Sequence, residues 1–183
     1  WEYRGAPRPF VHSKVMCWAA LNYGIQLAVD LDRSAPIDNW EKARKAVRRA
    51  VESKGYDSER GIFIQAFDHP CMDAALLLLP RVGFVDYDDE RMIRTTDAVR
   101  AELGEDGLLR RYADGDDGMD GREGAFLACS FWLVECLARQ GRLDEAHQTF
   151  QRAFSVGNDL GLFAEEYNTG AAQMLGNFPQ GLT

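Results

Sequence analysis

The sequence predicts an all-α protein in which three consecutive helical hairpins form part of a two-layer ring. Apolar residues recur with helical spacing in six segments, and no segment alternates strongly enough to demand a sheet. The first, third and fifth segments are apolar nearly all round, whereas the second, fourth and sixth carry a charged face. A helix that is apolar on every side is buried on every side, so inner and outer helices are expected to alternate.

The first three helices are expected over residues 9–29, 39–54 and 73–79. The first carries an apolar stripe that includes Trp18, a residue expected in the core. At the start of the second, Asp38 and Glu41 have the spacing of a capping box. Gly55 follows its last residue, at the position where a C-terminal glycine belongs. The third is short and wholly apolar after Asp73, which is expected to be its N-cap rather than a catalytic group.

The other three helices are expected over residues 89–103, 124–139 and 144–156. The fourth ends at Gly104 and the sixth at Gly157, again at glycines suited to a helix C-terminus. The fifth is apolar on all sides, and its Trp132 is expected in the core.

The connections between helices alternate in length as the helices alternate in character. Links from an inner to an outer helix are short, whereas the opposite links cover residues 55–72, 104–123 and 157–175. In a ring of hairpins all the long links lie at the same end, and long loops without helices of their own are usually functional. One face of the ring is therefore expected to carry the site.

The three long links repeat a five-residue pattern of a glycine, two apolar residues, a variable position and a polar residue. The polar position is held in turn by Gln65, Arg111 and Glu165. An aromatic residue follows in each link: Phe67, Tyr112 and Tyr167. Because Glu2 precedes an inner helix in the same way, these four polar side chains are expected to converge around the ring axis. Registry of the core alone could produce such a repeat, but it would not explain the change from Gln to Arg to Glu.

This constellation is typical of a sugar site, since aromatic rings cover the apolar faces of a pyranose while Arg and Gln bind hydroxyl groups. Glycoside hydrolysis needs a protonated carboxylic acid for the leaving oxygen and a second carboxylate that activates water or attacks. Glu2, beside Trp1, is expected to be the acid because an apolar setting disfavours its charged form. Glu165, favoured over Glu166 by the repeat register, is the expected base.

These residues also have purely structural interpretations. Glu2 could be a solvated terminal residue, and Glu165 with Glu166 could be a surface acidic pair. Arg111 could be a surface salt-bridge partner. The acidic stretch 114–120 resembles a calcium loop only loosely and is interpreted as a flexible acidic loop.

Composition argues against several classes of function. The formal net charge of −8 argues against nucleic-acid partners and anionic membranes, while it suits a neutral sugar. No apolar run approaches the roughly 20 residues of a membrane helix. The four cysteines form no CxxC pair and the three histidines are dispersed, so no metal or cofactor is expected. The cysteines are interpreted as buried free thiols in a reducing compartment, which predicts a cytoplasmic protein.

Several motifs together resemble bacterial glycoside hydrolases of family 15, over essentially the whole chain. The motifs are Trp1-Glu2-Tyr3-Arg4-Gly5, residues 7–18, residues 124–133, Glu165-Glu166-Tyr167 and residues 175–180. The resemblance implies a partial (α/α)6 toroid, with residues 1–183 as the C-terminal half of a single catalytic domain. It also implies a missing N-terminal half that supplies further contacts to the terminal glucose, so the fragment alone is expected to be inactive.

The resemblance implies inversion at the anomeric carbon, with Glu2 as general acid, Glu165 as general base and Arg111 as a sugar contact. Fungal members have a second acidic residue at the position of Tyr3, so contacts to the leaving group must differ. The expected substrate-binding set is Trp1, Gln65, Arg111, Tyr112 and Tyr167. The two catalytic carboxyl groups are expected about 6.5–9.5 Å apart, a separation that leaves room for a water molecule.

The predicted function is that of an exo-acting, glucoamylase-like α-glucosidase that releases β-glucose from the ends of α-glucans or oligosaccharides. A trehalase of the same family, acting on a disaccharide, is the alternative. A non-catalytic helical-repeat module belongs to another class, but its connections would be short and similar at both ends. An isomerase or lyase on the same toroid is a further alternative.

Overall fold

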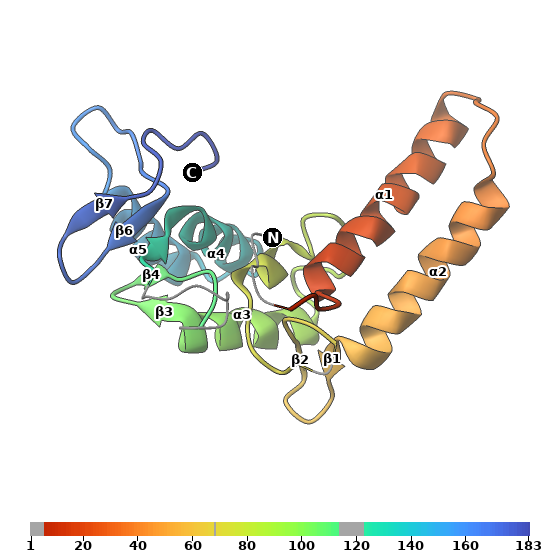
Figure 1. Cartoon of the computed structure of the whole chain (residues 1–183), viewed down its shortest axis with the longest axis horizontal. Helices are drawn as coiled ribbons and strands as arrows, with labels where there is room; N and C mark the ends of the chain where they lie inside the picture. The colour runs from red at the N-terminus through yellow and green to blue at the C-terminus, as the bar shows by residue number, and fades with distance from the viewer. Residues whose placement is uncertain (1–5, 68, 114–122) are drawn as a thin grey trace.

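The computed structural model describes residues 6–67, 69–113 and 123–183, and it is mostly helical (Figure 1). The described α-helices are α1 (Val11–Asp30), α2 (Ile37–Lys54), α3 (Glu90–Leu103), α4 (Leu127–Arg139) and α5 (Leu143–Phe154), and a 3-10 helix is η1 (Ala74–Leu78). The short strands are β1 (Tyr56–Asp57), β2 (Ile62–Phe63), β3 (Gly104–Glu105), β4 (Leu108–Leu109), β5 (Ala125–Phe126), β6 (Glu166–Asn168) and β7 (Gln173–Leu175).

The helices pack as sequential neighbours. α1 and α2 form a hairpin that projects away from the other helices, and α4 packs against α5 (Figure 1). η1 contacts α1, α3 and α4, so it joins the projecting hairpin to the rest of the fold. In the part of the chain that the structure describes, no helix is long and apolar enough to cross a membrane.

All six expected helices are present, but three of their details are wrong. α2 begins at Ile37 after Pro36, and no side chain caps it, so the expected capping box is absent. The third helix is a 3-10 helix, although Asp73 does cap it by accepting a hydrogen bond from the Ala75 N–H at 2.8 Å. α5 ends at Phe154 rather than at Gly157.

The strands were not expected from the sequence. β1 pairs antiparallel with β2, and β3 with β4, so each of the first two long links contains a tight hairpin. In the third link, β6 pairs with both β5 and β7. The fifth helix therefore begins only at Leu127, because the two residues before it are in β5. Strands of two or three residues are too short to show an alternating pattern.

The expected alternation of buried and half-exposed helices holds for most of the fold. η1 and α4 are buried on several sides, whereas Val51 is the one fully buried residue of α2. Trp18 is in the core as expected, and Trp132 packs against the core while staying partly exposed. The expectation fails for α1, because Met16, Tyr23 and Leu27 are exposed on it.

Candidate functional site

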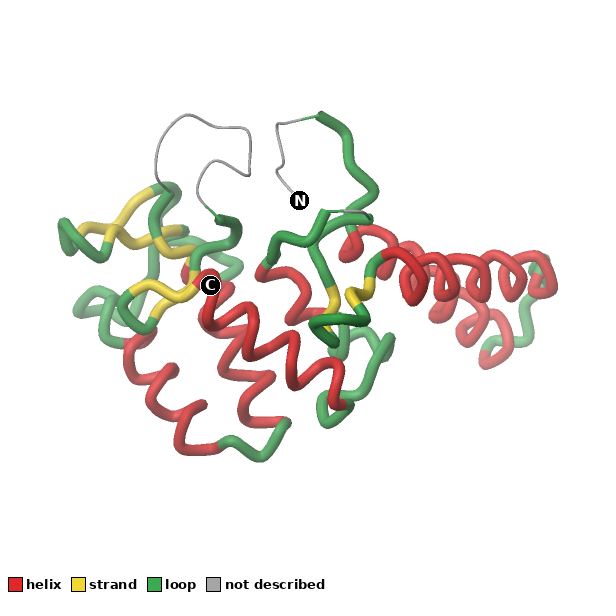
Figure 2. The backbone as a smooth tube through the Cα atoms, turned by 90° about the horizontal axis from the view of Figure 1, so that it is seen from below, coloured by secondary structure: helices red, strands yellow, loops and turns green. Residues whose placement is uncertain are grey.

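The repeated polar position has the same backbone role in all three long links. In each link its carbonyl oxygen accepts a hydrogen bond from the first N–H of the inner helix in the hairpin that precedes the link. The pairs are Gln65 with Val11 of α1 (2.9 Å), Arg111 with Ala74 of η1 (3.0 Å) and Glu165 with Leu127 of α4 (3.1 Å). All three polar residues therefore lie at the N-terminal ends of the helices expected to be inner. In Figure 2 the strands of these links gather toward one end of the helices.

The glycine that opens the repeat is also structurally equivalent in the three links. Gly61, Gly107 and Gly161 have φ values of 71°, 75° and 72°. Backbone in this left-handed region favours glycine, because a Cβ would crowd the neighbouring carbonyl. The repeat is thus a repeat of backbone conformation as well as of residue type.

Arg111 is a buried cation held by a carboxylate. Its side chain is 8% exposed; its Nε donates to Oε2 of Glu123 at 2.8 Å, and its Nη2 bonds the other carboxyl oxygen. Burial disfavours the charged guanidinium, but the bond to Glu123 outweighs that effect and raises the pKa of Arg111 above its ordinary value. The surface salt-bridge interpretation of Arg111 therefore does not describe this side chain.

Two aromatic rings pack against the Arg111 guanidinium. The rings of Tyr112 and Phe126 each have their centre 5.5 Å from its central carbon. Tyr112 is buried, and this burial, together with the charge of Asp73, raises the pKa of its hydroxyl. The site thus has a positive charge held between apolar surfaces, which is an arrangement suited to a hydroxyl-rich ligand.

Glu165 is half-buried at the start of the β6–β7 hairpin. Its carboxylate Oε2 accepts hydrogen bonds from the backbone N–H of Asn177 at 3.1 Å and from the Asn177 side chain at 2.9 Å. Gly176 has a φ of 71°, and a Cβ there would lie 3.0 Å from the Glu165 Cβ, so glycine is favoured where the chain passes this residue. The β7 side of the hairpin therefore sets the direction of the Glu165 carboxylate.

Glu166 points into the neighbouring backbone. Its Oε2 accepts a hydrogen bond from the Gly124 N–H at 3.0 Å. Tyr167, the next residue along β6, lies beside Arg152, whose guanidinium is 5.9 Å from the ring centre, and against the smaller apolar cluster of Leu108 and Leu127. Successive residues of a strand face opposite sides, so the Tyr167 side chain points away from that of Glu166.

The structure brings together Arg111, Tyr112, Glu123 and Glu166, and Glu165 directly precedes Glu166 in the chain. We call Glu123, Glu165 and Glu166 the acidic cluster. Gln65 lies in the first link, fully buried, and neither atom of its side-chain amide has a hydrogen-bond partner among the described residues. The predictions for Trp1 and Glu2 fall outside the described residues, as does that for the acidic stretch 114–120, so the expected carboxyl separation stays a prediction.

Sequence reasoning missed Glu123. The only signal for it is its position directly before the apolar segment that starts at Gly124, because the twelfth residue after Arg111 has no periodic relation to it. The described residues contain no group of three or more Cys, His, Asp or Glu side chains that could hold a metal ion. Of the cysteines, Cys129 and Cys136 are buried free thiols as expected, whereas Cys17 is exposed.

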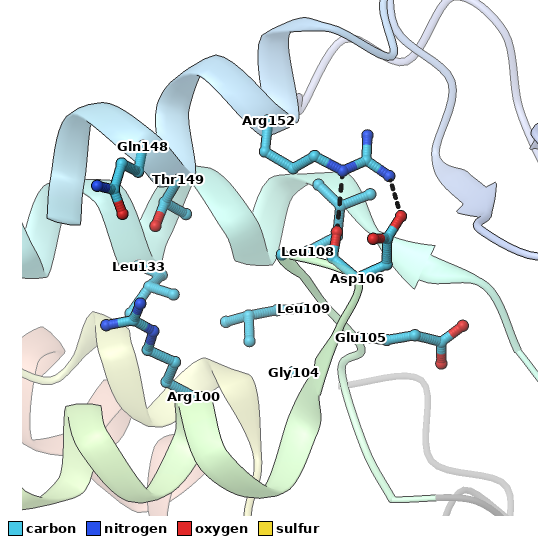
Figure 3. A pocket seen from close by; sticks show the side chains of 11 residues that line it. Arg100, Gly104, Glu105, Asp106, Leu108, Leu109, Leu133, Gln148, Thr149 and Arg152 are labelled. Atoms are coloured by element: carbon cyan, nitrogen blue, oxygen red, sulfur yellow. Dashed lines mark hydrogen bonds and ion pairs between the residues drawn. The ribbon is translucent and has the colours of Figure 1, made fainter.

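Two cavities lie near these elements. A cavity of about 200 Å³ beside the acidic cluster is lined by Glu105, Glu123, Gly124, Asn168, Thr169 and Gly170. A larger one of about 410 Å³ lies between α3, α5 and the β3–β4 hairpin (Figure 3). There Arg152 binds the Asp106 carboxylate at 2.6 Å and its carbonyl at 2.9 Å, which clamps the tip of the hairpin. None of the expected site residues lines either cavity, but the smaller one is bordered by Glu123, the partner of Arg111.

The charge of Glu166 predicts a pH-dependent stability. Burial raises the pKa of Glu166, the nearby Glu123 adds to the rise, and the Gly124 hydrogen bond and Arg111 oppose it. A raised pKa in the folded state means that this contribution is present at low pH and is lost as pH rises through the folded-state pKa. The variant Glu166→Gln keeps an oxygen for Gly124 and does not ionise, so its Tm at pH 7 should be higher than that of the parent.

The check on this prediction is a pair of thermal melts. At about pH 4, near the ordinary pKa of glutamate, the parent and Glu166→Gln should melt together. The exposed Glu59 provides the control, since Glu59→Gln should leave Tm unchanged at both pH values. A lower Tm of Glu166→Gln at pH 7 would mean that the ionised carboxylate stabilises the fold.

The family described as glycosyl hydrolases family 15 matches residues 1–182. The chain is 40% identical to a trehalase of Thermoplasma volcanium over 184 residues, which is all of this chain and 29% of that protein. It is also 40% identical to a trehalase of Mycobacterium tuberculosis over 185 residues, covering 27% of that protein. The chain thus spans less than a third of these relatives.

Solved structures show the same fold at lower sequence identity. A structure titled "Glycosidase Wild Type" has a TM-score of 0.74 and 22% identity, covering 87% of this chain and 42% of that one. A GH63 mannosylglycerate hydrolase from Thermus thermophilus, in complex with glucose, has a TM-score of 0.62 and 16% identity, covering 91% and 43%. At these identities the likeness concerns the fold alone.

Proposed function

The chain belongs to glycosyl hydrolase family 15, and from that premise we propose that it is part of the catalytic domain of an inverting trehalase. The observation that carries the choice of substrate is the 40% identity, over the whole chain, to relatives named trehalase. These relatives favour the trehalase alternative over the glucoamylase-like function that the sequence first suggested. Release of glucose from α-glucan ends is therefore the second candidate.

We propose that residues 1–183 form the C-terminal half of an (α/α)6 toroid, as three inner and outer hairpins. Two observations support this proposal. The relatives are more than three times as long as the matched region. The exposed apolar side chains of α1, among them Tyr23 and Leu27, would be covered by a neighbouring hairpin of the same ring.

In the proposed reaction, Glu2 donates a proton to the glycosidic oxygen as the bond from that oxygen to the anomeric carbon breaks. Glu165 takes a proton from a water molecule, whose oxygen forms a new bond to the anomeric carbon from the opposite face. Arg111, Tyr112, Gln65, Trp1 and Tyr167 are the proposed sugar contacts. The hydrogen bonds from Asn177 support the role of Glu165, because they fix the direction of its carboxylate.

The experiment uses the full-length protein that carries this chain, supplied with trehalose or with maltotriose. We expect trehalose to have at least about a tenfold higher kcat/KM, since a site built for one disaccharide discriminates by lost contacts. Proton NMR in the first minutes should show one β-glucose and one α-glucose per trehalose, because inversion changes only the attacked carbon. Two α-glucose products would contradict inversion, and a preference for maltotriose would restore the glucoamylase-like function.

A further inference from the structure

We propose that Glu123 is a positioning residue that holds the Arg111 guanidinium in the orientation in which it meets the sugar; this inference rests on the proposed function. Glu123 binds Arg111 through both carboxyl oxygens. A guanidinium and a carboxylate joined in this way share one plane, so the contact sets an orientation as well as a distance. Because Arg111 occupies both oxygens, Glu123 acts through Arg111.

The packing around the pair makes that orientation specific. The Arg111 side chain is 8% exposed and the Glu123 side chain 21% exposed. The rings of Tyr112 and Phe126 flank the guanidinium. A buried cation that loses a partner costs far more than an exposed one, so a change of Glu123 is expected to alter how the Arg111 guanidinium is held.

Glu123 is itself fixed to the strand that follows Glu165. The next residue, Gly124, donates its N–H to the Glu166 carboxylate at 3.0 Å. A Cβ at Gly124 would lie 2.9 Å from the Tyr167 carbonyl oxygen, so the backbones pass too closely there for a side chain. β5 then continues as the antiparallel partner of β6, with Phe126 opposite Glu166.

These contacts form a short physical connection between two residues far apart in the sequence. Arg111 is bound to Glu123, the adjacent Gly124 is bound to Glu166, and Glu166 directly follows Glu165. The position of the proposed sugar contact is therefore set relative to the proposed base. A displacement of about 1 Å in such an arrangement can cost on the order of a hundredfold in rate.

The first test measures the orientation of Arg111 directly, in the 183-residue chain. Its Nε–Hε NMR signal, identified by its absence in Arg111→Lys, should exchange slowly with water. In Glu123→Gln the exchange should be at least about tenfold faster, because a neutral acceptor replaces a charge-assisted hydrogen bond. Glu123→Asp keeps the charge and should restore part of the protection. Unchanged exchange in Glu123→Gln would overturn the proposal.

The second test measures trehalose hydrolysis by the full-length protein. Glu123→Gln should raise KM about tenfold with a smaller change in kcat, because a ground-state sugar contact is weakened. A merely structural loss would lower the active fraction, and so kcat, with KM unchanged. The double variant Glu123→Gln, Arg111→Lys should lose no more kcat/KM than Arg111→Lys alone, since the two residues act as one unit.

The matched control is Glu145 on α5, which binds Arg142 through both carboxyl oxygens at 2.8 and 2.9 Å. Glu145→Gln breaks a similar pair outside the acidic cluster and should leave KM unchanged. The proposal would be overturned if the Glu123→Gln, Arg111→Lys double variant lost as much kcat/KM as the two single variants lose together. If the parent protein hydrolyses neither trehalose nor maltotriose, the proposed function fails, and the exchange measurement alone decides whether Glu123 holds Arg111.

Discussion

Replacing Glu165 by glutamine in the full-length protein is expected to remove at least about 99% of trehalose hydrolysis, because general-base catalysis contributes on the order of 10²–10⁴-fold. Glutamine keeps an oxygen that can accept the two hydrogen bonds from Asn177, so the β6–β7 hairpin should keep its shape. The measurements are the initial rate of glucose release and the Tm. A rate within a factor of about two of the parent would refute the role of Glu165 as base.

The adjacent carboxylate provides the comparison for this variant. Glu166 directs its carboxylate to the Gly124 N–H rather than to Asn177, so Glu166→Gln should lose much less activity than Glu165→Gln. The two variants make the same chemical change at neighbouring positions. If Glu166→Gln were the inactive one, the repeat register would be displaced by one residue and the base would be Glu166.

The largest expected effect on stability comes from Phe63→Ala in β2. Phe63 is fully buried, and its ring packs edge-on against Tyr56 and Phe84 at 5.5 and 6.2 Å between centres. Its N–H donates to the Thr95 hydroxyl on α3 at 2.9 Å. Truncating a buried phenylalanine to alanine costs about 3–5 kcal/mol, a large part of the about 5–15 kcal/mol that holds a typical domain folded.

Urea unfolding of the 183-residue chain tests this prediction through the free energy of unfolding. The control is Phe150→Ala on α5, because Phe150 is 41% exposed and lies on the surface of the aromatic group it shares with Phe154. That change should cost less than about 1.5 kcal/mol, the range typical of an aromatic pair. Equal losses in the two variants would mean that β2 is not part of the cooperative core.

Much of the local structure could be predicted from the sequence. The periodic segments are helices, and Gly55 and Gly104 follow the ends of α2 and α3 as expected. The repeat that relates Gln65, Arg111 and Glu165 is confirmed as a repeat of backbone position, because each carbonyl accepts the first N–H of a helix. These features depend on residues close together in the chain, so their spacing is visible in the sequence.

The sequence by itself determined the helical class, the three equivalent link positions and the family likeness, because periodicity, glycine conformation and motif order are all properties of short segments. Only the tertiary structure decided which carboxylate binds Arg111, that Glu165 is directed by Asn177, and that part of α1 is exposed. Those outcomes depend on contacts between distant segments, such as β5 with β6. The chain must fold before a charge is buried, and burial decides which partner stabilises it.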